Sequence, residues 1–182
     1  MRVELPHRTV NAVTADDPWE PKMILPFTHP AATLCPIARD TGAVPPAASP
    51  DQLTCSVTLP AGPRAAAVAR QTVRAALYAY ALAPLEPAAV QAASELVGSA
   101  WRMDPEGELY LSVRYRDGSL RLISYDGHPE HAHPRLAAHC EARRRATLRV
   151  LAAVVRDHGG NWGFGPSREP GGGNRSWVSL PG

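Results

Sequence analysis

Residues 109–124 read LYLSVRYRDGSLRLIS, two alternating segments on either side of an Asp-Gly pair. Every second side chain can face a protein core, as in half-buried strands; these positions are Leu109, Leu111, Val113 and Tyr115 before the pair, and Leu120, Leu122 and Ser124 after it. Asp117-Gly118 tolerates the positive backbone angles of a tight turn. The stretch therefore predicts a β-hairpin, and the rest of the fold can be built around it.

The residues before the hairpin predict one strand and two helices. Residues 53–59 alternate in the same way and predict a strand. Residues 64–81 are rich in alanine and predict a helix, which Pro84 and Pro87 separate from a second helix at 87–102. The second helix carries an apolar stripe at helical spacing, formed by Ala89, Ala93, Leu96, Val97 and Ala100.

After the hairpin, residues 126–140 contain glycine, two prolines and four histidines, and they predict a loop. Residues 141–157 predict a helix with Leu148, Leu151, Ala152 and Val155 on its apolar stripe, ended by two glycines. Residues 162–164 and 175–180 predict a closing pair of strands around a run of three glycines.

Strands and helices do not alternate strictly in this order, which argues against a parallel Rossmann-like sheet. We predict the α+β class: a two-layer sandwich with a mixed or mostly antiparallel sheet and helices packed on one face. Prolines recur throughout residues 1–50 and disfavour regular structure there. We therefore predict a proline-rich, irregular N-terminal arm at 1–50 and one domain at 51–182.

The composition narrows the function classes. The net charge of +2 is too small to favour direct nucleic-acid binding, and no stretch approaches the roughly 18 apolar residues of a membrane span. The three cysteines, Cys35, Cys55 and Cys140, have no paired spacing, which favours a reducing, cytoplasmic compartment over a disulfide framework. Lys22 is the single lysine, so residues 51–182 contain none for phosphate binding or catalysis.

Four short motifs then follow one another: Ser94-Glu95-Leu96-Val97-Gly98-Ser99-Ala100, Asp126-Gly127-His128-Pro129, Leu148-Arg149-Val150-Leu151, and Gly171-Gly172-Gly173 before Trp177-Val178. Their order and spacing resemble the GHKL-type, histidine kinase-like ATPase domain of the anti-sigma regulatory factor serine kinases. That family binds ATP with Mg²⁺ and phosphorylates an anti-sigma antagonist on serine. The resemblance implies the same sandwich fold for residues 51–182 of a bacterial transcription regulator.

The resemblance also implies site positions. Glu95 falls at the catalytic base, and Ser99 at the asparagine that holds Mg²⁺. Asp126 and Gly127 fall in the adenine-binding motif. Arg145 and Thr147 fall at two glycines that let the backbone approach the phosphates.

Several of these positions depart from the family pattern. A serine hydroxyl is a poorer Mg²⁺ ligand than the amide carbonyl that it replaces. Side chains at 145 and 147 obstruct the approach that glycines allow. Met103 and Asn174 replace a histidine and a lysine that the family often has. We therefore expect weak or lost ATP binding.

We expect the domain to act by binding a protein partner, such as a sigma factor or an anti-sigma antagonist. An active serine/threonine kinase is the alternative, and the sequence leaves a homodimer open.

Histidines and arginines are concentrated between residues 128 and 149. The first group, His128, Glu130, His131, His133, His139 and Cys140, has a spacing that matches no strong zinc pattern. We predict no metal site there and keep a small metal-binding domain as a further alternative. The second group, Arg143, Arg144, Arg145 and Arg149, predicts a solvated helix face.

Overall fold

The structure is a computed structural model that describes residues 48–168 and 172–182. Residues 1–47 of the predicted arm lie outside that range. The described chain forms five strands, four α-helices and two short 3₁₀ turns at Pro50–Gln52 and Ala83–Leu85. Among the described residues, no helix combines the length and the apolar character that crossing a membrane requires.

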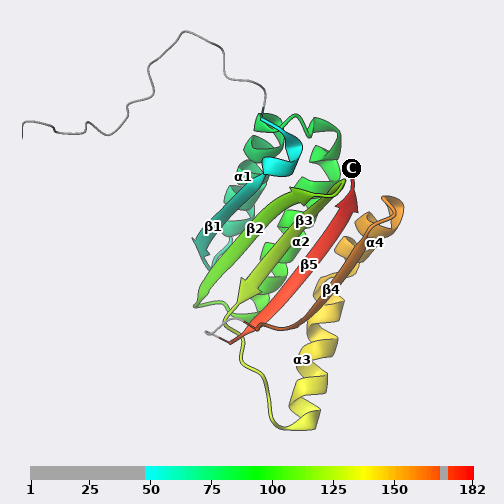
Figure 1. Ribbon diagram of the computed structural model, residues 1–182. Helices are drawn as coiled ribbons and strands as arrows, with labels where there is room; N and C mark the ends of the chain where they lie inside the picture. The colour runs from blue at the N-terminus through cyan, green and yellow to red at the C-terminus, as the bar shows by residue number, and fades with distance from the viewer. Residues whose placement is uncertain (1–47, 169–171) are drawn as a thin grey trace, which may run out of the picture. The chain divides into compact units, whose positions relative to one another are not determined.

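The five strands form one open sheet in the order β1-β2-β3-β5-β4 (Figure 1); they are β1 (Thr54–Pro60), β2 (Glu108–Arg116), β3 (Ser119–Asp126), β4 (Asn161–Pro166) and β5 (Asn174–Pro181). Every neighbouring pair is antiparallel. The final strand β5 lies between β3 and β4, so the end of β3 and the start of β5 meet at one end of the sheet. The prediction of an α+β fold with an antiparallel sheet is confirmed.

The predicted hairpin joins β2 and β3. Asp117 and Gly118 have φ angles of 53° and 70°, the two positive values that a two-residue type I′ turn requires. The register pairs Arg116 with Ser119 next to the turn and Tyr110 with Tyr125 farther along. Because a shift by one residue would turn every side chain to the opposite face, this turn fixes which residues reach the core.

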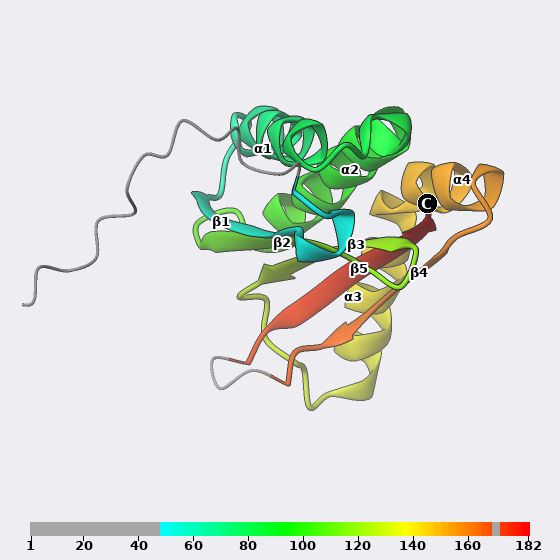
Figure 2. The same ribbon diagram turned by 45° about the horizontal axis from the view of Figure 1, so that its top comes forward.

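Helices α1 (Ala65–Ala79), α2 (Glu86–Met103) and α4 (Arg149–Asp157) cover one face of the sheet, and Figure 2 shows the two layers edge-on. Leu96 and Val97 of α2 are 0% and 1% exposed, as the apolar stripe of that helix predicts. The core also contains the inward-facing residues of the central strands, which are Leu109, Leu111, Val113, Leu120, Leu122, Val178 and Leu180.

The predicted loop at 126–140 and helix at 141–157 are partly wrong. Helix α3 (Pro134–Thr147) begins inside the predicted loop, and the chain changes direction at Leu148 before α4. Proline is well tolerated at the first helical position, so Pro134 starts the helix instead of preventing it. The ring of His133 caps this end by accepting a hydrogen bond from the Arg135 amide at 3.3 Å.

Helix α3 lies beside β4 and extends past the end of the sheet (Figure 1). Most of its side chains are exposed, and Arg144 is the residue of this helix that is buried. The direction change at Leu148 lets α4 turn back over the sheet and bury Leu148, Leu151 and Val155. The junction of α3 and α4 therefore lies close to α2 and to the end of β3, where the candidate site is found.

Candidate functional site

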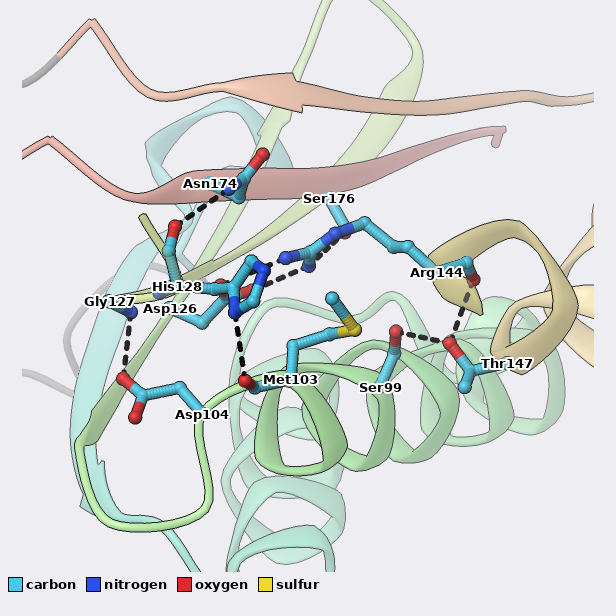
Figure 3. Close-up of polar contacts among 10 residues, drawn as sticks. All are labelled: Ser99, Met103, Asp104, Asp126, Gly127, His128, Arg144, Thr147, Asn174 and Ser176. Carbon is cyan, nitrogen blue, oxygen red and sulfur yellow. Dashed lines mark hydrogen bonds and ion pairs between the residues drawn. The ribbon is translucent and has the colours of Figure 1, made fainter. Parts of the chain in front are cut away.

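Figure 3 shows the region where the first two motifs lie beside the end of α3 and the start of β5. Gly171 of the last motif lies outside the described residues. Ser99 comes from α2, Asp126 and Gly127 from the end of β3, Thr147 from the last turn of α3, and Asn174 from the start of β5. Residues distant in sequence are brought together here by the antiparallel pairing of β3 with β5 and by the packing of α2 beneath them.

A buried ion pair lies at the centre of this region. Arg144 Nη1 donates to Asp126 Oδ2 at 2.6 Å, and Arg144 Nη2 donates to Asp126 Oδ1 at 3.0 Å. The two side chains are only 3% and 1% exposed. A guanidinium matches a carboxylate in this two-point geometry, which gives a strong and directional contact. Arg144 does not belong to a solvated helix face, so the prediction for that arginine is wrong.

The pair leaves Asp126 with no free oxygen. Its Oδ1 also accepts the backbone N–H of His128 at 3.2 Å. Each carboxylate oxygen therefore has at least one donor from the chain itself. The Asp126 side chain is also only 1% exposed, so an adenine amino group could reach it only if the surrounding chain moved, and displacing Arg144 would leave a buried guanidinium without its partner.

Ser99 is committed to a second internal contact. The hydroxyl oxygens of Ser99 and Thr147 are 2.6 Å apart, and the Thr147 hydroxyl donates to the Arg144 carbonyl at 2.8 Å. A hydroxyl has one proton to donate. Because Thr147 donates its proton to the Arg144 carbonyl, Ser99 is the donor in the hydrogen bond between Ser99 and Thr147. Ser99 is 0% exposed, so this chain of hydrogen bonds fastens α2 to the end of α3.

These residues do not fit Mg·ATP. Mg²⁺ requires several oxygen ligands in near-octahedral geometry and keeps bound waters, whereas the Ser99 oxygen is fully buried against Thr147. Arg145 and Thr147 lie within the last turn of α3, where backbone amides serve the helix itself.

The remaining predicted positions have structural roles or none. Glu95 is half-buried and accepts a hydrogen bond from Gln91 at 2.8 Å. The Gly127 amide donates to Asp104 Oδ2 at 3.0 Å, and a Cβ at this position would lie 2.6 Å from the same oxygen. Gly127 thus allows the chain leaving β3 to approach the end of α2 closely.

A cavity of about 840 Å³ lies beside this region, between α3 and β4. Arg145 lines it, as do Met103 and Asn174, two further positions of the family pattern. The other predicted site positions do not line it; they are Glu95, Ser99, Asp126, Gly127 and Thr147. Arg145 is 62% exposed, pairs with Glu141 at 2.9 Å, and lies 5.2 Å from the ring centre of Phe164. The cavity therefore borders the position where the family motifs place the nucleotide, without including Ser99, Asp126 or Thr147.

Two histidines of the histidine-rich segment and one cysteine lie close together on the wall of this cavity. His128, His131 and Cys140 place one potential ligand atom each within 4.8 Å of one another. His133 and His139 do not join them: His133 caps α3, and His139 is exposed on that helix. The spacing along the sequence did not predict this cluster, because helix α3 brings Cys140 back toward the end of β3.

The comparisons with known proteins add no family assignment: no protein-family model matches the sequence, and no curated protein matches it significantly. Functional inference for this chain rests on its own residues and their geometry.

Arg144 is the site residue that sequence reasoning missed. A signal for it was present: a carboxylate expected to be buried at Asp126 needs a cationic or hydrogen-bonding partner. Residues 51–182 contain no lysine, so a cationic partner had to be an arginine or a protonated histidine. Four arginines lie between 143 and 149, and the sequence alone does not indicate which of them turns inward.

Proposed function

We propose that this domain is a non-catalytic regulatory module related to the GHKL-type ATPase domain of anti-sigma regulatory factors. Its nucleotide site is replaced by internal contacts, and it acts by binding a protein partner, such as a sigma factor or an anti-sigma antagonist. The resemblance of the four motifs supports the relationship, together with the arrangement of two helices, a hairpin and a closing strand pair in one two-layer sandwich.

The observation that carries the proposal is the pair between Arg144 and Asp126. In the family, the aspartate at this position selects adenine, and here both of its oxygens are bound by a guanidinium from the same chain. Ser99, at the Mg²⁺ position, is likewise bound to Thr147. Two separate parts of the expected nucleotide site are therefore occupied by side chains of the domain.

The face of the sheet opposite the helices offers a surface for a partner. Its side chains alternate with the buried core residues of β2, β3 and β5; the aromatic and aliphatic ones are Tyr110, Ile123, Tyr125 and Trp177, and the charged ones are Glu108, Arg114, Arg116, Arg121 and Arg175. Tyr110 packs edge-on against Tyr125, and Arg121 lies 5.8 Å from the centre of a Trp177 ring. Tyrosine, tryptophan and arginine dominate binding energy at protein interfaces. The excess of arginine favours an acidic partner.

The proposal predicts that partner binding depends on this face and not on nucleotide. The full chain should be tested by biolayer interferometry against purified sigma factors and anti-sigma antagonists from the same genome. Tyr125→Ser and Arg121→Glu should each weaken the interaction by about 2 kcal/mol, which is about 30-fold. Arg156→Glu, an equal charge reversal at an exposed position of α4, should leave the affinity unchanged.

Addition of Mg·ATP should not alter that affinity, and no partner should become phosphorylated. An interaction that requires Mg·ATP, or phosphoserine on an antagonist that disappears with Glu95→Ala, would establish the active-kinase alternative instead. Equal weakening by Arg156→Glu and Arg121→Glu would show that the outer sheet face is not the binding surface.

A further inference from the structure

We propose that His128, His131 and Cys140 form a zinc-binding site that joins helix α3 to the end of strand β3. The three side chains come from three different places: the residue pair after β3, the connection to α3, and the middle of α3 itself. Their potential ligand atoms lie within 4.8 Å of one another, and all three residues are half-buried on the wall of the same cavity. This inference is independent of whether the domain binds a sigma factor.

The separation of the two imidazoles suits a shared ion. His128 Nε2 and His131 Nε2 are 3.3 Å apart. Two nitrogens bound to one tetrahedral zinc ion at its usual bond length are about 3.3–3.4 Å apart. The corresponding nitrogen–sulfur separation is about 3.6 Å, so a shift of Cys140 by about 1 Å completes a three-ligand set. Cys140 lies on a largely exposed helix.

The tautomer that neutral His128 adopts is one that can bind metal. Its Nδ1 lies 3.1 Å from the Met103 carbonyl (Figure 3). Because a carbonyl can only accept, Nδ1 carries a proton, and in the neutral ring Nε2 then presents a lone pair. A carbonyl that accepts the other ring N–H in this way orients a metal-binding histidine and raises its basicity. Without an ion, the His131 Nε2–H donates to that lone pair, so zinc replaces a proton in an existing contact.

The backbone of His128 is also held in place before any ion binds. Its N–H donates to Asp126 Oδ1 at 3.2 Å, and its carbonyl accepts from Asn174 Nδ2 at 2.8 Å. Asp126 is itself fixed by Arg144. The residues that replace nucleotide recognition thus position the first ligand, which lowers the conformational cost of binding.

The donor set selects the ion. Two imidazole nitrogens and one thiolate suit Zn²⁺, whereas Mg²⁺ and Ca²⁺ prefer oxygen ligands. Zinc usually has four ligands, and three protein ligands leave one position for water or for a small molecule in the cavity. Bound zinc would connect Cys140 of α3 to the sheet, in the half of the helix where no side chain is buried.

The test is metal titration of the full chain under reducing conditions. Zinc should bind with one-to-one stoichiometry and raise the thermal midpoint by mass action. Cobalt, as a spectroscopic substitute, should give the visible bands of a four-coordinate ion and a thiolate-to-cobalt charge-transfer band. His131→Ala and Cys140→Ser should each weaken zinc binding by at least about 100-fold, since losing even an outer-shell partner costs about 10–100-fold.

Two matched variants serve as controls. His139→Ala removes an exposed histidine next to Cys140, and Cys55→Ser removes the other free cysteine of the described residues. Both should retain wild-type zinc affinity and cobalt spectra. The proposal is wrong if zinc binds at well below one equivalent. It is equally wrong if His131→Ala and His139→Ala behave alike, or if the thiolate band persists in Cys140→Ser.

Discussion

Replacing Arg144 with methionine should lower the free energy of unfolding by about 3–5 kcal/mol, because it leaves a buried carboxylate without its partner. Asp126 is 1% exposed at the side chain and receives two of its hydrogen bonds from Arg144. The remaining donor, the His128 amide, cannot replace a guanidinium. Urea denaturation, monitored by circular dichroism, measures this loss of unfolding free energy directly.

Two comparisons make this result specific. Arg143→Met changes a neighbouring exposed arginine that only donates to the Arg102 carbonyl, and it should cost about 0.5 kcal/mol or less. Combining Arg144→Met with Asp126→Leu removes both charges and should recover much of the lost stability, because an apolar pair of similar volume often substitutes for a buried ion pair. Equal effects of Arg143→Met and Arg144→Met would show that the pair does not form.

Leu96→Ala should destabilise the domain by about 2–5 kcal/mol, the usual cost of emptying a fully buried leucine site. Leu96 is 0% exposed and lies in the layer between α2 and the sheet. The adjacent Glu95→Ala should change stability by about 0.5 kcal/mol or less, since Glu95 contributes one exposed hydrogen bond to Gln91. Thermal or urea unfolding of the two variants measures the difference, and equal losses would contradict the orientation of α2.

The fold was largely predictable because its strongest signals are local. The alternation of residues 109–124 and the Asp117-Gly118 pair specify a hairpin without reference to other parts of the chain. The apolar stripe containing Leu96 and Val97 specifies which face of α2 is buried. The start of α3 was missed because Pro134 was interpreted as a helix breaker, although proline favours the first turn of a helix.

The site was predictable only in part, because its decisive contacts join distant residues. The motifs assign Ser99, Asp126 and Thr147 to one nucleotide site, and in the structure Ser99 contacts Thr147 directly. The pairing of Arg144 with Asp126 spans 18 positions and depends on where α3 ends. The approach of Cys140 to His128 depends on the same helix, so no spacing rule along the sequence could reveal it.

The central claim is that internal contacts have replaced the nucleotide site, and calorimetric titration with Mg·ATP tests it most directly. The wild type should show no binding tighter than about 1 mM. Ser99→Asn alone should not restore affinity for Mg·ATP. Its combination with Arg145→Gly and Thr147→Gly should not restore it either, because the Arg144 guanidinium still forms its ion pair with Asp126. Micromolar or tighter binding of Mg·ATP by the wild type would contradict the account and favour an active kinase.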